Sequence, residues 1–271
     1  MRQNMKSNVL KPLAELISLS GKRALITGSA TGIGKAIAYR FAEAGAELEL
    51  IDINGEGLKT VKEELSNFKV EINIQRVDLS IKQEIDILWK KLEGNEPDIL
   101  VNNAGTYPFK KFTEIDESFL KNFTEINLNS VFWMCQHMIK RRLKKGGVII
   151  NFGSIEALLP FKDDLAHYNI SKAGVIAFTR TLAKEYGKHN FRINAIIPGG
   201  IMTTGVKNKM KDAFKLELGL IKSGIEFKQR LPLGRFGQPD EVALMTLVLA
   251  SDLSSYIHGT LIPIDGGFLS A

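Results

Sequence analysis

The chain has 271 residues, 44% of them hydrophobic and 24% charged, which excludes a disordered or low-complexity protein. Its single cysteine, Cys135, excludes an intrachain disulfide and a zinc site made of cysteines alone, and it favours a reducing compartment. The net charge of +6 does not by itself indicate a nucleic acid partner, because the densest basic run, residues 140–145, ends a helical pattern just before two glycines.

Neither a membrane span nor a signal peptide is expected. The longest apolar run, near Val242–Ala250, is far shorter than the roughly 18 residues that cross a bilayer. The first twenty residues lack the apolar stretch and cleavage site of a secretory signal. We therefore expect a cytoplasmic protein that binds neither a membrane nor a nucleic acid.

Short apolar segments alternate with amphipathic ones along most of the chain. We expect residues 1–20 to be an N-terminal extension with a short helix at Pro12–Leu19, and residues 21–271 to form one domain that includes a substrate loop at about 200–228. The predicted strands are Arg23–Thr27, Ala46–Ile51, Val70–Val77, Asp98–Asn102, Gly147–Phe152, Phe191–Ile197 and Thr260–Ile264. The predicted helices are Gly34–Ala44, Gly55–Ser66, Ile81–Leu92, a long one over Glu117–Leu143, Ala166–Tyr186 and Asp240–Ala250.

Several of these strands are rich in Ile, Leu and Val with little polar alternation, which is typical of strands covered on both faces. The pattern predicts an α/β fold, a doubly wound, Rossmann-type sheet of seven parallel strands with helices on both faces. Glu49 is the exception, because a buried strand offers no evident place for its charge.

A glycine-rich segment, Thr27–Gly34, lies between the first predicted strand and the following helix. It contains Gly28, Gly32 and Gly34 in the spacing Gly-x-x-x-Gly-x-Gly, with Thr31 and Ile33 between them. Glycine lets the backbone turn tightly and approach a ligand closely, and the start of a helix presents free N–H groups to an anion. The segment therefore predicts a site for the pyrophosphate of a dinucleotide.

Asp52, followed by Ile53, ends the second predicted strand, where an acidic side chain can bind the ribose hydroxyls of adenosine. A 2′-phosphate there would be repelled by the carboxylate. The sequence places no Arg or Lys beside Asp52, or among residues 29–31, to receive such a phosphate. We therefore predict NAD(H) rather than NADP(H) as the cofactor, with a helix-capping role for Asp52 as the alternative.

Three motifs together resemble the short-chain dehydrogenase/reductase family: Thr27–Gly34, Asn102–Gly105 and Tyr168–Lys172. Further matching segments are 77–79, 126–128, 151–154, 194–199 and 264–267, in the same order as in the family. The resemblance covers nearly everything from Lys22 to Gly267. It implies a hydride-transferring oxidoreductase.

The spacing of the Tyr-x-x-x-Lys motif has a physical explanation. Tyr168 and Lys172 are four positions apart in a predicted helix and so lie on one face. A free tyrosine is a poor base at neutral pH, and a nearby ammonium group favours the phenolate, so we expect Lys172 to lower the pKa of Tyr168. Tyr168 would then exchange a proton with an alcohol oxygen while hydride moves at a nicotinamide. Ser154 lies just past a predicted strand, at the end where such sheets bind ligands.

The resemblance implies a role for each residue of this set. Ser154 would hydrogen-bond the reacting oxygen, Tyr168 would be the general acid/base, and Lys172 would hold the nicotinamide ribose. Asn127, in the long predicted helix, would support a water-linked proton path to Lys172. The implied cofactor contacts are Gly28, Thr31, Gly32, Ile33, Gly34, Asp52, Ile53, Asp78, Leu79, Asn103, Ala104, Gly105, Tyr168, Lys172, Pro198, Gly199, Ile201 and Thr203.

The predicted substrate-lining residues are mostly apolar: Tyr107, Glu156, Leu159 and Phe161. They favour a small or medium secondary alcohol or ketone. A 3-oxoacyl thioester reductase stays open, because lysines between residues 207 and 228 could meet an acidic carrier. A sugar or polyol dehydrogenase stays open too, because Glu156 could accept hydroxyl hydrogen bonds. A non-catalytic dinucleotide sensor or scaffold is disfavoured, because the catalytic set is intact.

Two further expectations concern histidines and assembly. The four histidines have no metal-ligand spacing, so no metal is predicted, although His167 could edge the substrate site beside Tyr168. The resemblance also implies a homotetramer built on the long fourth helix, the fifth helix and the C-terminal strand.

Overall fold

The computed structural model describes residues 10–203 and 227–271. Its centre is a sheet of seven parallel strands in the order β3-β2-β1-β4-β5-β6-β7, which confirms the predicted doubly wound fold. The strands are β1 (Arg23–Thr27), β2 (Glu47–Asp52), β3 (Ile72–Arg76), β4 (Ile99–Asn102), β5 (Gly147–Phe152), β6 (Phe191–Pro198) and β7 (Leu261–Ile264). The strand order reverses between β1 and β4, so the crevice at their carboxyl ends is where a sheet of this kind binds ligands.

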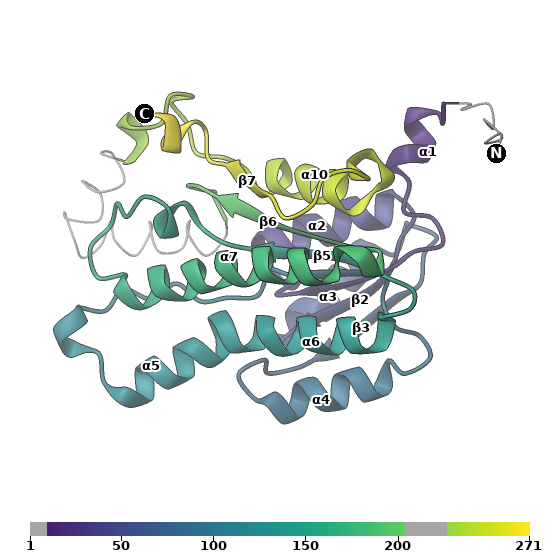
Figure 1. The fold of residues 1–271 in the computed structure, drawn as a ribbon, viewed down its shortest axis with the longest axis horizontal. Helices are drawn as coiled ribbons and strands as arrows, with labels where there is room; N and C mark the ends of the chain where they lie inside the picture. The colour runs from purple at the N-terminus through teal and green to yellow at the C-terminus, as the bar shows by residue number, and fades with distance from the viewer. Residues whose placement is uncertain (1–9, 204–226) are drawn as a thin grey trace, which may run out of the picture.

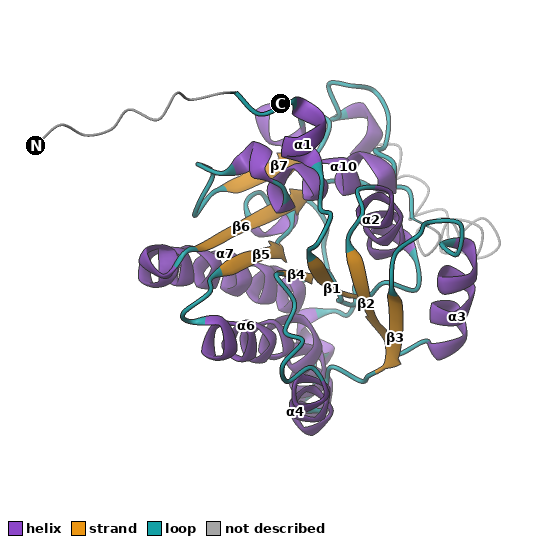
Figure 2. Ribbon diagram, turned by 90° about the vertical axis from the view of Figure 1, so that its right-hand side faces the viewer, coloured by secondary structure: helices purple, strands orange, loops and turns teal. Residues whose placement is uncertain are grey.

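Helices cover both faces of the sheet (Figure 1). One face carries α2 (Gly32–Glu43), α3 (Gly55–Glu64) and α10 (Pro239–Ala250), and the other carries α4 (Lys82–Lys91), α6 (Ser130–Arg142) and α7 (Ala166–Tyr186) (Figure 2). The remaining helices are α1 (Leu13–Ile17) and α5 (Glu117–Thr124), with short 3₁₀ turns at Phe112–Glu114, Ile155–Ala157, Gly187–His189, Asp252–Ser254 and Phe268–Ser270. None of the helices within residues 10–203 and 227–271 combines the length and the apolar character needed to cross a bilayer.

Two apolar layers hold these helices to the sheet. Phe41 of α2 and Val242 of α10 are fully buried in one layer, and Trp89 of α4 and Met134 of α6 are fully buried in the other. A third, smaller cluster surrounds Phe268 near the C-terminus. Full burial of one such side chain contributes about 1.5–3 kcal/mol, so the strand ends that form the crevice rest on a rigid core.

Glu49 on β2 is only 3% exposed, yet its charge has partners on both neighbouring strands. Arg23 Nη1 on β1 lies 3.6 Å from Glu49 Oε1, and Asn73 Nδ2 on β3 donates a 3.0 Å hydrogen bond to the same oxygen. Burial raises the pKa of Glu49, while Asn73 and Arg23 act against that rise. The buried charge is therefore compensated across the sheet, which the pattern of one strand could not reveal.

The single helix predicted over Glu117–Leu143 is wrong in one respect. Residues Glu125–Asn129 form a π-helical turn between α5 and α6. Such turns insert an extra residue into a helix and are frequent at functional sites. Asn127 lies in this turn and is fully buried.

Other predicted boundaries shift by a few residues. The third strand is Ile72–Arg76 rather than Val70–Val77, and α2 begins at Gly32, two residues before the predicted start. Most of the predicted substrate loop at about 200–228, including most of its lysines, lies outside the described residues.

Candidate active site

The glycine turn after β1 presents bare backbone to the crevice. Gly28 has a φ of +65°, and a Cβ on it would lie 2.9 Å from the Cα of Ala104. A Cβ on Gly34 would clash with the carbonyl oxygen of Gly28. Because neither position has room for a side chain, main-chain N–H groups at the start of α2 stay accessible, and this cradle fits a pyrophosphate.

Asn103, just after β4, fixes the shape of this turn. Its Nδ2 donates to the carbonyl oxygens of Thr27 (3.0 Å) and Gly28 (3.1 Å). The amides of Asn103 and Ala104 both donate to Thr27 Oγ1, at 3.1 and 3.0 Å. The Asn102–Gly105 motif is therefore joined to the glycine turn across the β1–β4 crevice.

Asp52 faces the same turn from the end of β2. Its Oδ2 accepts a 3.0 Å hydrogen bond from the amide of Ala30, and its Oδ1 accepts a 2.9 Å bond from the amide of Asn54. The side chain of Asn54, not that of Asp52, caps α3. The capping alternative for Asp52 therefore does not describe its position.

One basic residue near Asp52 was missed. The prediction found no Arg or Lys beside Asp52, but the sheet pairs Asp52 with Arg76 at the end of β3. A Cβ on Gly55 would lie 3.7 Å from Arg76 Cβ, so Arg76 borders the start of α3. Strand register set these residues side by side, and register is not visible in the sequence.

Asp78 and Leu79 follow β3 at the same edge. The amide of Val77 donates to the carbonyl oxygen of Asp52 at 3.0 Å, which ties the two strand ends together. Asp78 Oδ1 accepts from the Ser80 hydroxyl at 2.6 Å, and Leu79 is buried. These predicted adenine contacts therefore lie near the predicted ribose contact.

Ser154 and Tyr168 meet at the carboxyl end of β5. Ser154 follows β5 and accepts a 3.2 Å hydrogen bond from the amide of Glu156. Tyr168 lies in the first turn of α7, close enough to Ser154 for the serine hydroxyl to lower its pKa. The two hydroxyl groups can therefore address one substrate oxygen.

Lys172 lies one turn further along α7 and is 5% exposed. Its Nζ donates a 2.8 Å hydrogen bond to the carbonyl oxygen of Phe152, and it lies 5.9 Å from the centre of the Tyr168 ring. Burial lowers the pKa of Lys172 to about 8. A methyl group placed on Gly105 would lie 3.7 Å from Lys172 Nζ and 3.2 Å from Asn127 Oδ1, so these three residues adjoin.

Asn127 binds the backbone of the segment that follows β4. Its Oδ1 accepts from the amide of Thr106 and its Nδ2 donates to the carbonyl oxygen of Thr106, both at 2.8 Å. The π-helical turn thus braces the chain that leads to Tyr107. The water-linked proton path to Lys172 stays a prediction.

The predicted direction for the pKa of Tyr168 is reversed in the structure. The pKa of Tyr168 is raised to about 12, because burial and, to a smaller extent, the charge of Glu156 outweigh the lowering by Ser154. Lys172 is not among these influences, and its Nζ donates to the Phe152 carbonyl oxygen. Tyr168 is therefore a protonated phenol at neutral pH, suited to donating a proton.

Two of the predicted substrate-lining residues gather around Tyr168. The ring of Tyr107 meets the ring of Tyr168 edge-on, with centroids 4.6 Å apart at 86°. Glu156 is 4% exposed, and its charge raises the pKa of Tyr107. The other two, Leu159 and Phe161, pack instead against the apolar cluster around Phe268.

His167 is buried behind this group rather than at its edge. Its ring lies edge-on to Phe119 and Phe123 of α5, at 5.0 and 4.6 Å, and its Nε2 is 3.0 Å from the carbonyl oxygen of Pro108. Since a carbonyl needs a donor, the proton belongs on Nε2. His167 thus fixes the backbone next to Tyr107.

The predicted nicotinamide contacts follow β6. The Gly199 amide donates to the carbonyl oxygen of Ile264 at 3.0 Å, and Ile201 pairs with Gly237. A Cβ on Gly32 would lie 3.4 Å from Thr203 Cγ2, so Thr203 reaches the glycine turn. Pro198 ends β6 directly before this segment.

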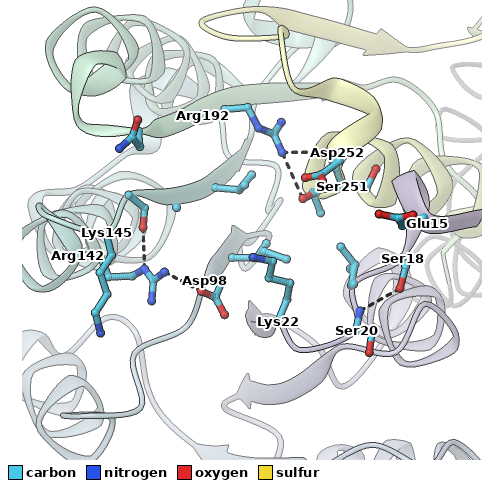
Figure 3. A pocket seen from close by; sticks show the side chains of 17 residues that line it. Glu15, Ser18, Ser20, Lys22, Asp98, Arg142, Lys145, Arg192, Ser251 and Asp252 are labelled. Carbon is cyan, nitrogen blue, oxygen red and sulfur yellow. Dashed lines mark hydrogen bonds and ion pairs between the residues drawn. The ribbon is translucent and has the colours of Figure 1, made fainter. Parts of the chain in front are cut away.

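A cavity of about 480 Å³ lies at the opposite, amino-terminal end of the strands (Figure 3). Arg142 in its wall donates to the Gly146 carbonyl at 2.8 Å and pairs with Asp98 at 2.7 Å. Arg192 donates to the carbonyl oxygens of Leu249 (2.8 Å) and Ser251 (3.0 Å) at the end of α10. Both guanidinium groups therefore have a structural role.

Comparison with known proteins agrees with this geometry. A family model described as Enoyl-(Acyl carrier protein) reductase matches residues 28–269. The chain is 36% identical over 254 residues to the 3-oxoacyl-(acyl-carrier-protein) reductase FabG of Chlamydia pneumoniae, an alignment that covers 93% of this chain and 98% of that protein. It is 34% identical over 259 residues to the NAD-dependent glycerol dehydrogenase of Listeria innocua, covering 93% and 95% of the two chains.

A solved structure also matches. The L-sorbose reductase of Gluconobacter frateurii, complexed with NADPH and L-sorbose, superposes with a TM-score of 0.88 at 31% identity and covers 94% of this chain and 99% of its own. Sequence, fold and the grouping of Ser154, Tyr168 and Lys172 beside the glycine turn agree. The chain therefore belongs to the short-chain dehydrogenase/reductase family, and it is an oxidoreductase that interconverts alcohol and carbonyl groups with a nicotinamide dinucleotide.

Proposed function

We propose that the chain is an NAD(H)-dependent enzyme that interconverts a secondary alcohol and a ketone, with Tyr168 as the general acid/base. The observation that carries the proposal is the grouping of Ser154, Tyr168 and Lys172 at the carboxyl end of β5, where Lys172 Nζ donates to the Phe152 carbonyl oxygen and Ser154 lowers the pKa of Tyr168. That end of the sheet also holds the glycine turn that fits a pyrophosphate.

The raised pKa of Tyr168 keeps its phenol protonated at neutral pH, so the proton is present when a ketone is reduced. A reduced nicotinamide, when bound, would supply a hydride to the carbonyl carbon, whose C=O double bond would become a single bond. The phenol proton of Tyr168 goes to the carbonyl oxygen, to which Ser154 donates a hydrogen bond. Solvent then returns a proton to Tyr168, so NADH, one proton and the ketone give NAD⁺ and the alcohol.

The other residues of the set hold the reactants. Lys172, with its ammonium group near Asn127 and Gly105, would bind the nicotinamide ribose. Asp78 and Leu79 would contact the adenine, and the segment from Pro198 to Thr203 the carboxamide. Asn127 would position Lys172 and the backbone at Thr106.

NAD(H) is preferred in this proposal because the Asp52 carboxylate, bound to the Ala30 amide, would face a 2′-phosphate. Arg76 acts against this preference for NAD(H), since its guanidinium group can bind a phosphate. The test compares turnover with NADH and NADPH in the wild type and in Arg76→Met. We expect NADH to be preferred by both; a clear NADPH preference in the wild type that Arg76→Met abolishes would overturn the proposal.

Two substrate alternatives of the same family follow from the relatives. One relative is a 3-oxoacyl-(acyl-carrier-protein) reductase and another is a glycerol dehydrogenase. A panel of simple ketones, polyols and 3-oxoacyl thioesters distinguishes them by kcat/KM. NADH binding without reduction of any carbonyl compound would favour a non-catalytic sensor instead.

Assembly and location belong to the same proposal. Ile170 on α7 is 68% exposed and Phe132 on α6 is 40% exposed, which suits burial of these helices against other subunits in a homotetramer. Cys135 is buried and unpaired, in keeping with a cytoplasmic protein. Residues 1–20 would be an extension of a domain that runs from 21 to 271.

A further inference from the structure

Glu156 is a buried carboxylate beside the reacting centre that the proposed mechanism does not use. It lies two positions after Ser154, and its amide donates to Ser154 Oγ at 3.2 Å. Its Oε2 accepts hydrogen bonds from the amides of Phe161 (2.9 Å) and Lys162 (3.4 Å). These contacts fix the carboxylate in place on the 3₁₀ turn that follows β5.

Tyr107 connects this carboxylate to the catalytic tyrosine. Its ring meets the ring of Tyr168 edge-on at 4.6 Å, and its phenol lies close enough to the Glu156 carboxylate for that charge to raise its pKa. Burial and the charge of Glu156 hold the pKa of Tyr107 well above its usual range, so Tyr107 stays a protonated donor. His167 and Asn127 fix the backbone on either side, at Pro108 and Thr106.

The chemistry of this pair limits what can bind over Tyr168. A buried carboxylate is stable only when donors surround it, and an ionised one can accept about four hydrogen bonds. The amides of Phe161 and Lys162 both donate to Oε2, so the carboxylate retains acceptor capacity. Because Glu156 is already buried, a purely aliphatic substrate would add no donor to it, and an anionic group would be repelled. A hydroxyl group of the substrate would donate a further hydrogen bond to the Glu156 carboxylate.

We propose that Glu156, assisted by Tyr107, recognises a hydroxyl group next to the reacting carbon, so that the substrate is a neutral hydroxy ketone or the corresponding vicinal diol. This inference rests on the proposed oxidoreductase function and names its substrate class. Glu156 is then a specificity residue that binds substrate, and it takes no part in hydride or proton transfer.

The experiment compares ketones that differ only in a hydroxyl group. One pair is hydroxyacetone and butanone, and the other is 2-hydroxycyclohexanone and 2-methylcyclohexanone, each reduced with NADH. We expect the wild type to prefer the hydroxylated member at least about a hundredfold in kcat/KM, because a site built around a hydroxyl group rejects the analogue that lacks it. Glu156→Gln should lower that ratio about tenfold, and Glu156→Leu should abolish it.

Controls separate recognition from folding and from the proposed function. Equal NADH affinity in the wild type and both variants shows that the variants are folded. Equal use of both members of each pair by the wild type, an unchanged ratio in Glu156→Leu, or faster turnover of a 3-oxoacyl thioester than of either hydroxy ketone would overturn the inference while leaving the oxidoreductase function standing. No turnover of any ketone with intact NADH binding would overturn both.

Discussion

Both ends of the sheet bury charged side chains, but the side chains at the amino end make more hydrogen bonds than those at the carboxyl end. At the amino end, Arg142 and Arg192 each make three or more hydrogen bonds, to carbonyl oxygens, Asp98 and Ser254. At the carboxyl end, Lys172 Nζ makes one hydrogen bond within the described residues, to the Phe152 carbonyl.

The carboxyl end also holds polar atoms with no partner. Within residues 10–203 and 227–271, His167 Nδ1 and Asn169 Oδ1 are buried without a hydrogen bond, and both residues flank Tyr168. Buried polar groups are normally paired, so exceptions that cluster beside one residue point to a place kept open for chemistry. At the amino end, by contrast, the guanidinium groups of Arg142 and Arg192 that line the cavity are fully engaged with carbonyl oxygens, Asp98 and Ser254.

The largest difference between the two ends should appear when Ser154 is changed to Ala. Loss of one hydrogen-bond donor to a reacting oxygen costs about 10²–10³ in kcat. Steady-state kinetics with the best ketone should show that loss with unchanged NADH affinity. A decrease below about fivefold would mean that Ser154 does not contact the reacting oxygen.

Arg142→Met at the amino end should affect stability and leave the chemistry alone. Removal of Arg142 leaves the half-buried Asp98 carboxylate with the Arg23 amide as its remaining donor and costs about 3 kcal/mol. Urea unfolding measures the loss, and Arg141→Met on the same helix serves as the matched control, with a loss of about 1 kcal/mol or less. If kcat per folded Arg142→Met molecule fell tenfold, the amino end would contribute to catalysis as well as to stability, contrary to this prediction.

The buried ammonium group of Lys172 should give stability a distinctive dependence on pH. Its folded pKa of about 8 lies below the ordinary 10.5, so between these values the unfolded chain binds a proton that the folded chain has released. The free energy of unfolding therefore rises with pH across that window, by on the order of 3 kcal/mol at most. Chemical unfolding of the wild type and Lys172→Met in parallel isolates this contribution; a difference that stays flat from pH 8 to 10.5 would refute it.

The smallest effect should come from His167, which acts through Tyr107. His167→Leu removes the donor to the Pro108 carbonyl, worth about 1 kcal/mol, and should raise KM about fivefold with little change in kcat. His167→Gln keeps a donor and should restore part of the affinity. If Gln and Leu behaved alike, the hydrogen bond would not be what positions Tyr107.

Local patterns predicted the fold and much of the candidate site. The glycine spacing of Gly28 to Gly34 and the one-turn spacing of Tyr168 and Lys172 are properties of short segments, so the sequence alone reveals them. Alternating apolar segments likewise predicted the seven strands, because parallel strands are buried on both faces.

What could not be predicted depends on residues far apart in the chain. The partners of Glu49 and the position of Arg76 beside Asp52 depend on strand register. The direction of the Tyr168 pKa shift depends chiefly on burial, which the spacing of Tyr168 and Lys172 does not specify. The π-helical turn at Asn127 is a local change of winding that an apolar pattern of helical period does not detect.

A single-turnover measurement on Tyr168→Phe tests whether Tyr168 is the general acid of ketone reduction. The variant is mixed with NADH and ketone, and nicotinamide absorbance is followed beside equilibrium NADH binding. We expect NADH affinity within about twofold of the wild type and hydride transfer slowed about a thousandfold, because general acid catalysis contributes a factor of about 10²–10⁴ to the rate. Hydride transfer at the wild-type rate in Tyr168→Phe would contradict this expectation.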